Sequence, residues 1–323
     1  MSEQGNIALH TTNLRVGYKK GHQTQVLFEP LNIQLIQGEL VCFMGSNGVG
    51  KTTLIKTLAG IYPPLGGSVI HQNPIAIVLT DKISGGLMTV RDLVTYGRYP
   101  HLNRWLTLQD QDHRLIDNAI RLVHLQSIEN KQLNQLSDGQ LQMAMIAKAL
   151  AQDTNMLLLD EPTAHLDLNN RVEIMNLLRT LAREEGKTIL VATHELDLAL
   201  QTADKIWLAT QDQKIVEGMP EDLVLDGTFD RVFQLKGFDL KTGKIAHLPY
   251  RKIAVQLAGA GPEFLWTKNA LERSGYEITS NASIKILVVI HQEGASFRIE
   301  TASIQKEFST LKELIAVLNN MEN

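Results

Sequence analysis

The stretch "GSNGVGKTT", residues 45–53, has the residue types and spacing of a loop that binds phosphate. It fits the pattern G-x-x-x-x-G-K-[ST], with Gly45, Gly50, Lys51 and Thr52 at the fixed positions. Glycines let successive backbone N–H groups turn inward around a polyphosphate, because no Cβ lies in the way. We therefore predict that Lys51 contacts the β- and γ-phosphates of a nucleoside triphosphate and that the Thr52 hydroxyl ligates Mg²⁺. The predicted nucleotide-binding residues of the loop are Gly45, Ser46, Asn47, Gly48, Val49, Gly50, Lys51, Thr52 and Thr53.

The elements around this loop come in the order that the pattern requires. "ELVCFMG" (39–45) is a short apolar run ending in glycine, which indicates a buried strand. After the loop, Leu54, Ile55 and Leu58 lie on one face of a predicted helix, whose N-terminus adds partial positive charge and unpaired N–H groups. The alternative is a glycine-rich strand–helix turn with an exposed lysine. The agreement between loop and context favours the nucleotide site.

A pair of carboxylates follows a second predicted buried strand. In "NMLLLDEPTAHLD" (155–167), four apolar residues lead into Asp160 and Glu161 at the strand end. A carboxylate there can hold Mg²⁺, which suits Asp160. Its neighbour can polarise a water that attacks the γ-phosphate, which suits Glu161. The alternative, a strand that ends in two solvated acids, is disfavoured because the phosphate loop lies upstream.

The bulk composition limits the classes of function. The chain has 323 residues, enough for two domains, and its net charge of −4 gives no general attraction to nucleic acid or anionic lipid. The one cysteine, Cys42, lies in the first apolar strand and cannot form an internal disulfide, which fits a reducing compartment. The N-terminal residues lack the features of a signal peptide, and no apolar run is long enough to span a bilayer. We therefore expect a cytoplasmic protein without a nucleic-acid partner, whose membrane role, if any, requires another protein.

The stretch between these motifs, "QLSDGQLQMAMIAKALAQ" (135–152), opens with a residue, Ser137, that can N-cap a helix. Alone, "SDGQ" is a routine turn into a helix. In this position it resembles the signature motif of the ATP-binding cassette (ABC) ATPases. The resemblance extends from about residue 9 to about residue 249. It implies an α/β P-loop NTPase fold with a RecA-like core, an antiparallel β-subdomain and a helical subdomain at about residues 87–151, together forming a cassette domain over 1–249.

The resemblance implies roles for further residues. Tyr18 in "LRVGYKKG" resembles the aromatic residue that stacks on adenine, and Asp167 in "TAHLD" ends a segment similar to the D-loop. His194 in "LVATHELDLAL" resembles the switch histidine, which implies a catalytic role beside Glu161. Without the family, Tyr18 would be an edge-strand tyrosine and His194 a strand-end histidine. The stretch "TVRDLVTYGRYPH" (89–101) is similar to the ATPases of importers for iron-siderophores, haem and cobalamin.

In this family two cassettes pair head to tail, and each ATP lies between the phosphate loop of one and the signature of the other. The resemblance thus implies that Ser137 and the N–H of Gly139 reach the γ-phosphate across the interface, with Gln140 and Asp167 also at the nucleotide site. The chain carries one set of motifs. We therefore expect a homodimer, or a pair with a second ATPase chain, bound to a many-helix membrane permease on the inner face of the cell membrane and indirectly to a substrate-binding protein.

Two positions depart from the family pattern. Thr80, followed by Asp81, stands where a glutamine usually contacts Mg²⁺ and the attacking water. Its hydroxyl is too short for the same reach, although it could act through a bridging water, and coupling to the permease could be weaker. Asp138 replaces the first glycine of the signature, where a carboxylate aimed at a triphosphate would be repulsive. We expect Asp138 to face solvent or the partner chain and Gly139 to approach the phosphate.

Residues 250–323 lie outside this resemblance and are predicted to form a small α+β domain of order βαββα. The order is a strand at "KIAVQL", a helix at "EFLWTKNALERS", two strands at "IKILVVIHQ" and "SFRIETA" joined around Glu293 and Gly294, and a closing helix at "TLKELIAVLNN". Pro262 in the first turn and Gly275 just past the end mark the bounds of the first helix. One hypothesis is that Gly259, Gly261 and this helix start bind an anion or small regulator. An accessory domain that stabilises or docks on the cassette dimer is the favoured alternative.

Three functions compete. The favoured one is the ATP-hydrolysing subunit of an importer for an iron chelate, haem or cobalamin. A soluble ABC-type ATPase working on ribosomes, nucleic acid or protein assembly would more naturally carry a tandem cassette, a coiled coil or a basic arm. A nucleotide-gated switch that barely hydrolyses ATP is disfavoured by Glu161 and His194, but Thr80 and Asp138 keep it open.

Overall fold

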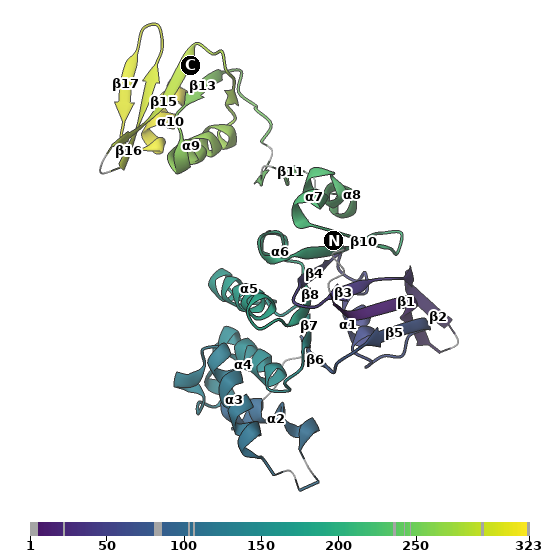
Figure 1. Cartoon of the computed structure of the whole chain (residues 1–323). Coiled ribbons are helices and arrows are strands. Elements are labelled where there is room, and N and C mark those ends of the chain that lie inside the picture. Colours follow the sequence, from purple (N-terminus) through teal and green to yellow (C-terminus); the bar gives the residue numbers. More distant parts are fainter. Residues whose placement is uncertain are drawn as a thin grey trace. The chain divides into compact units, whose positions relative to one another are not determined.

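The computed structural model describes residues 6–21, 23–80, 86–102, 104–105, 107–234, 237–241, 243–245, 247–291 and 294–321 (Figure 1). The chain divides into two compact units, Met1–Gln234 and Leu235–Asn323. The sequence analysis placed the domain boundary later, between residues 249 and 250, and that boundary stays a prediction. Each unit has its own core and is described by itself.

A six-stranded sheet forms the centre of the first unit, in the order β10-β9-β4-β8-β7-β6. All strands but β10 run parallel, and every residue of β4, β7 and β8 is buried. Continuous apolar strands of this kind belong to parallel sheets that are covered on both faces. Here α1 covers one face and α5 and α6 cover the other (Figure 1). The elements are β4 (Leu40–Met44), α1 (Lys51–Leu58), β6 (Ile75–Val78), β7 (Met156–Asp160), α5 (Leu168–Arg183), β8 (Thr188–Ala192), α6 (Leu196–Thr202), β9 (Lys205–Ala209) and β10 (Ile215–Gly218).

The parallel arrangement determines where the motif residues lie. In an open α/β sheet the loops that follow the strands gather at the carboxyl edge, where such proteins bind ligands. The loop after β4 is the glycine-rich loop, and β6, β7 and β8 lead into Thr80, Glu161 and His194. The fold therefore brings four separate stretches of sequence to one edge of the sheet. The predicted α/β P-loop core is confirmed.

An antiparallel sheet packs over α1. Its long strand β1 pairs with β2, β3 and β5. Phe28 of this sheet, Phe43 of β4 and Trp207 of β9 form a chain of aromatic contacts, with ring centroids 6.1 and 6.4 Å apart. One apolar core thus joins the two sheets, and the predicted β-subdomain is present. Its strands are β1 (Ile7–Lys20), β2 (Gln23–Leu31), β3 (Gln34–Ile36) and β5 (Gly66–His71).

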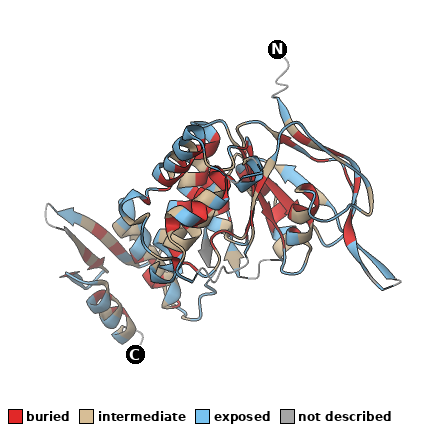
Figure 2. Ribbon diagram, turned by 90° about the horizontal axis from the view of Figure 1, so that it is seen from below, coloured by how far each residue is buried: buried red, intermediate tan, exposed pale blue. Residues whose placement is uncertain are grey.

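A helical region follows β6 and lies within the stretch where the helical subdomain is predicted. Thr89 and Ser137 each close a capping box at a helix start. Buried Arg98 ties the helices together, because it donates to Asp112 at 2.8 Å and to the carbonyl of Ala151 at 2.9 Å. The helices are α2 (Val90–Tyr96), α3 (Asp110–Leu122) and α4 (Asp138–Leu150), with short 3-10 turns at Tyr99–His101, Gln126–Ile128 and Leu133–Gln135. In Figure 2 the helices carry buried residues in stripes, the pattern of amphipathic helices.

The second unit contains a five-stranded sheet, β14-β13-β15-β16-β17, and two helices that share one core with it. The predicted strands and helices are present, but β14 and β17 were missed. β14 has only two residues, and "QKEF" in β17 is mostly exposed, so neither produces an apolar pattern. The first unit ends with α7 (Pro220–Leu225) and α8 (Thr228–Phe233). The elements of the second unit are β11 (Phe238–Asp239), β12 (Lys244–Ile245), β13 (Ala254–Ala258), α9 (Gly261–Arg273), β14 (Glu277–Ile278), β15 (Ile284–His291), β16 (Gly294–Glu300), β17 (Gln305–Phe308) and α10 (Leu311–Asn320).

The bounds of α9 agree with their sequence signals. Pro262 lies in its first turn and Gly275 follows its end with a φ of +86°. The glycines before it have local explanations: Gly261 has a φ of +81°, and a Cβ on Gly259 would lie 2.9 Å from the Cβ of Val288. These positions require glycine for the turn itself. Their proposed anion site stays a prediction, and Glu293, expected in the β15–β16 connection, lies outside the described residues.

Candidate functional site

The glycine-rich loop connects β4 to α1 and forms the wall of a cavity of about 480 Å³. Gly50 is the N-cap of α1 with a φ of +110°, a conformation that L side chains avoid, and a Cβ there would meet Leu27 at 2.9 Å. No side chain caps this helix start, so its N–H groups are available to an anion. The cavity has room for a nucleotide. Its lining residues are Tyr18, Gln25, Leu27, Asn47, Gly48, Gly50, Lys51, Thr52, Thr53 and Glu161.

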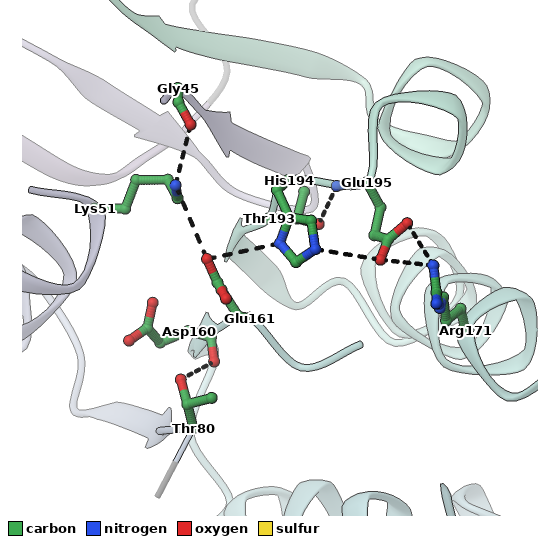
Figure 3. Close-up of polar contacts among 9 residues, drawn as sticks. All are labelled: Gly45, Lys51, Thr80, Asp160, Glu161, Arg171, Thr193, His194 and Glu195. Carbon is green, nitrogen blue, oxygen red and sulfur yellow. Dashed lines mark hydrogen bonds and ion pairs between the residues drawn. The ribbon is translucent and has the colours of Figure 1, made fainter. Parts of the chain in front are cut away.

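Lys51 is held at the base of this cavity with only 6% of its surface exposed. Its Nζ donates to the carbonyl of Gly45 at 3.1 Å and lies 3.9 Å from Glu161 Oε1 (Figure 3). Burial lowers the pKa of the Lys51 ammonium, while the charges of Glu161 and Asp160 oppose that change. The ammonium thus has one hydrogen bond and one longer ion pair, and a polyphosphate in the cavity would compete with both.

Asp160 has an oxygen that is suited to a cation. It ends β7 and is 3% exposed, and its Oδ1 is buried without a hydrogen-bond partner. Burial raises the pKa of the Asp160 carboxyl; the neighbouring charge of Glu161 also raises it, and a hydrogen bond from Thr52 lowers it. A buried carboxylate oxygen without a partner destabilises the fold unless a ligand binds to it. Together with the Thr52 hydroxyl it makes an oxygen donor set that fits Mg²⁺.

Glu161 and His194 approach each other from the ends of neighbouring strands. His194 Nδ1 lies 3.7 Å from Glu161 Oε1 (Figure 3). Glu161 has a φ of +49°, a left-handed conformation that costs a non-glycine residue about 1–3 kcal/mol. Its N–H donates to the carbonyl of Ala192 at 2.8 Å, which fixes the strained turn to the end of β8. Strain of this kind accumulates where a side chain must be aimed, and here it aims a carboxylate into the cavity.

The two departures from the family pattern have distinct surroundings. Thr80 donates its hydroxyl to the main-chain carbonyl of Asp160 at 2.9 Å, so its proton is used to join β6 to β7 (Figure 3). The Thr80 oxygen keeps its acceptor lone pairs, so the bridging-water hypothesis stays a prediction, and Asp81 lies outside the described residues. Asp138 is exposed, as expected, and lines a smaller cavity with Thr80 and Glu161.

Tyr18 lines the main cavity, whereas the signature residues do not. Tyr18 is 43% exposed on the wall of the main cavity, with its hydroxyl donating to Gln25 Oε1 at 2.7 Å. In the capping box of α4, each side chain of Ser137 and Gln140 instead accepts a hydrogen bond from the main-chain N–H of the other. The described lining of the main cavity contains no residue of the signature, and its contact with nucleotide stays a prediction.

Asp167 and Gly139 meet through a residue that the sequence analysis did not single out. Asp167 N-caps α5, and its second oxygen accepts a hydrogen bond from the Asn170 side chain at 2.8 Å. A Cβ on Gly139 would lie 2.5 Å from the Asn170 amide carbon. Gly139 is buried, and a larger residue there would displace the Asn170 side chain from its place between α4 and α5.

Arg171 and Glu195 were also missed, although they lie on the edge of the site. Arg171 Nη1 donates to both carboxylate oxygens of Glu195 at 2.9 Å. Glu195 Oε1 in turn lies 3.6 Å from His194 Nε2 (Figure 3). The sequence hinted at them only through their positions, because Arg171 follows Asp167 closely and Glu195 directly follows His194.

Known proteins similar to this chain are ATP-binding cassettes. The family described as "ABC transporter" matches residues 28–164, and the "Iron ABC transporter C-terminal domain" matches residues 251–319, for which the sequence analysis found no family. The iron(3+)-hydroxamate import ATP-binding protein of Bacillus subtilis is 34% identical over 75% of this chain and 95% of its own length.

Two solved structures extend the comparison. A metal-chelate type ABC transporter in an inward-facing conformation matches with a TM-score of 0.66 and 30% identity, over 71% of this chain and 90% of the other. The dimeric structure of a bacterial ABC transporter cassette matches with a TM-score of 0.57 and 26% identity, over 66% of this chain and 98% of the other.

Proposed function

The chain belongs to the ABC transporter ATPases, and from that premise we propose that it powers an importer for iron chelates of the siderophore class. The observation that carries the substrate class is the match of residues 251–319 to the iron-transporter C-terminal domain, on the same chain as the cassette. The similarity to an iron(3+)-hydroxamate import protein and to a metal-chelate type transporter supports it. Haem and cobalamin are further members of the substrate range that the stretch at 89–101 suggests.

In the proposed reaction the phosphate loop holds ATP and Glu161 acts on water. The N–H groups at the start of α1 and the Lys51 ammonium bind the β- and γ-phosphates. Tyr18, on the cavity wall, stacks on the adenine. Glu161 accepts a proton from the water that attacks the γ-phosphorus, and His194, beside it, contacts the γ-phosphate and the attacking water. The closeness of Lys51, Glu161 and His194 at the edge of the sheet supports these assignments.

Mg²⁺ would be held by Asp160 and the Thr52 hydroxyl. The unpartnered Asp160 Oδ1 and the hydrogen bond between these side chains support that choice. When bound, the ion would neutralise negative charge on the β- and γ-phosphates. Glu161, one residue further on, remains available for the water.

Two copies of the chain are proposed to complete each ATP site. The signature residues Ser137 and Gly139 lie outside the described lining of the chain's own nucleotide cavity, which is what a site shared between two copies requires. The similarity to a dimeric cassette structure supports this assembly. The capping box at Ser137 occupies the N–H groups of Ser137 and Gln140, so the start of α4 would attract the γ-phosphate of the partner through its helix dipole and the N–H of Gly139.

The cassette dimer is proposed to act on the inner face of the membrane through a permease. None of the helices in the described parts of the chain is both long and apolar enough to cross a bilayer. An importer subunit of this family works with a membrane-embedded permease, and indirectly with a substrate-binding protein that delivers the chelate.

Reconstitution tests this proposal. We expect the full chain, combined in liposomes with its membrane permease and substrate-binding protein, to take up a radiolabelled ferric hydroxamate when ATP is supplied on the chain's side. Uptake should stop when Glu161→Gln protein replaces the native chain, because hydrolysis is lost while the assembly remains. Uptake of haem or cobalamin with no uptake of ferric hydroxamate or other ferric siderophores would contradict the iron-chelate assignment and leave the ATPase intact.

A further inference from the structure

The His194 ring lies between two carboxylates that come from different parts of the site. Nδ1 is 3.7 Å from Glu161 Oε1, and Nε2 is 3.6 Å from Glu195 Oε1 (Figure 3). We propose that Glu195, clamped by Arg171, is a positioning residue that holds the His194 ring toward Glu161 for ATP hydrolysis. The inference rests on the role proposed for His194 above.

The ring needs such a support because its own surroundings are open. The His194 side chain is 49% exposed, whereas that of Glu195 is 18% exposed. Both ring distances exceed a direct hydrogen bond, and catalytic contacts of this length tighten when substrate binds. A carboxylate beside Nε2 can accept a hydrogen bond from that nitrogen, and it leaves Nδ1 on the side of Glu161. A carboxylate fixed beside Nε2 therefore sets the direction of the ring.

Glu195 is fixed at both its main chain and its side chain. Its N–H donates to Thr193 Oγ1 at 3.0 Å, and the N–H of buried Thr193 donates to the carbonyl of Phe43 in β4 at 3.0 Å. The carboxylate accepts two bonds from Arg171 Nη1 at 2.9 Å. Charge-assisted bonds of this kind are stronger than neutral ones, and here they join the residue after His194 to the first turn of α5.

Arg171 also connects this clamp to the segment before α5. Its Nε donates to the carbonyl of Leu166 at 2.6 Å, directly before Asp167. One guanidinium thus holds both the carboxylate behind His194 and the segment that resembles the D-loop. If a second cassette displaces that segment, the displacement reaches the His194 ring through Arg171 and Glu195.

A double-mutant cycle in the full chain tests the positioning role. We expect Glu195→Gln and Arg171→Gln each to lower kcat for ATP about tenfold, because small misplacements of a catalytic group are costly. KM for ATP should change by less than about twofold, since neither residue lines the phosphate-loop cavity. In a His194→Ala background neither substitution should lower kcat further, because the group that it positions is absent. The ¹⁵N shifts of the His194 ring, identified by their loss in His194→Ala, should change in Glu195→Gln.

Arg183→Gln is the matched control. Arg183 also lies on α5, and its Nη2 pairs with Asp204 Oδ1 at a distance of 3.1 Å. Neither residue lines the nucleotide cavity. This substitution should leave kcat and the His194 ring signals unchanged. A normal kcat and unchanged ring signals in Glu195→Gln, with His194→Ala impaired, would overturn the inference and leave the proposed function standing. Equal losses in native and His194→Ala backgrounds would also overturn it, because they indicate a purely structural role. A fully active His194→Ala chain would instead remove His194 from the proposed mechanism, and the positioning role with it.

Discussion

Replacing Glu161 by glutamine is expected to lower ATP hydrolysis by a factor on the order of a hundred or more while ATP still binds. The amide has nearly the same size as the carboxylate but cannot accept the proton of the attacking water. The backbone of residue 161 should keep its left-handed turn, because its N–H bond to Ala192 does not involve the side chain. Loss of a negative charge 3.9 Å from Lys51 should if anything favour nucleotide binding. Phosphate release and ATP binding are measured on the same preparation.

Glu184→Gln provides the control for this experiment, because it makes the same chemical change at an exposed position at the end of α5. It should hydrolyse ATP at the native rate. Turnover near the native value in the Glu161→Gln chain would exclude Glu161 as the base that acts on water.

Lys51→Ala is expected to weaken ATP binding about a hundredfold, since charge-assisted contacts to phosphate contribute about 1.5–3 kcal/mol each. The protein should remain folded, because the Lys51 ammonium has no apolar packing role and its partners are a loop carbonyl and a carboxylate. Calorimetric titration with a non-hydrolysable ATP analogue measures the affinity, and thermal unfolding reports the fold. Lys214→Ala, which removes an exposed lysine paired with Asp212, should bind the analogue normally. Unchanged affinity in a folded Lys51→Ala chain would show that the phosphate-loop assignment is wrong.

The gathering of the phosphate loop, Asp160 and Glu161 could be predicted, because parallel strands fix which loops lie at one edge of the sheet. Once "ELVCFMG" and "MLLLD" are recognised as buried parallel strands, the residues after them must lie at one edge, whatever the intervening sequence. That rule places Lys51, Asp160 and Glu161 together without knowledge of any side-chain contact. The glycine pattern likewise follows from a local requirement, because the φ of Gly50 is one that L side chains avoid.

The contacts around His194 could not be predicted, because they depend on the relative placement of α5 and the start of α6. Neither the bonds of Arg171 to Glu195 nor the packing of Asn170 on Gly139 has a sequence spacing that would reveal it. Thr80 is a similar case, since its bond to the Asp160 carbonyl exists only through the pairing of β6 with β7. Strand β17 was missed for a different reason, because its exposed polar residues follow no apolar alternation.

If two copies of the chain build each ATP site, a mixture of two differently defective chains should form one intact site. All chains carry Glu161→Gln, so that ATP binds without turnover. One variant adds Lys51→Ala, and the other adds Ser137→Asp, which keeps a good N-cap for α4 but sets a carboxylate against the γ-phosphate of the partner. A mixed dimer then has one site with both defects and one site with neither.

The measurement is the molecular mass of each sample with saturating ATP and Mg²⁺, by light scattering. The parent Glu161→Gln chain is expected to dimerise, each double variant alone to stay monomeric, and their mixture to recover a fraction of dimer. Dimer formation by the Ser137→Asp variant alone at the parent level, or a mixture that stays monomeric while the parent dimerises, would contradict a site shared between two chains.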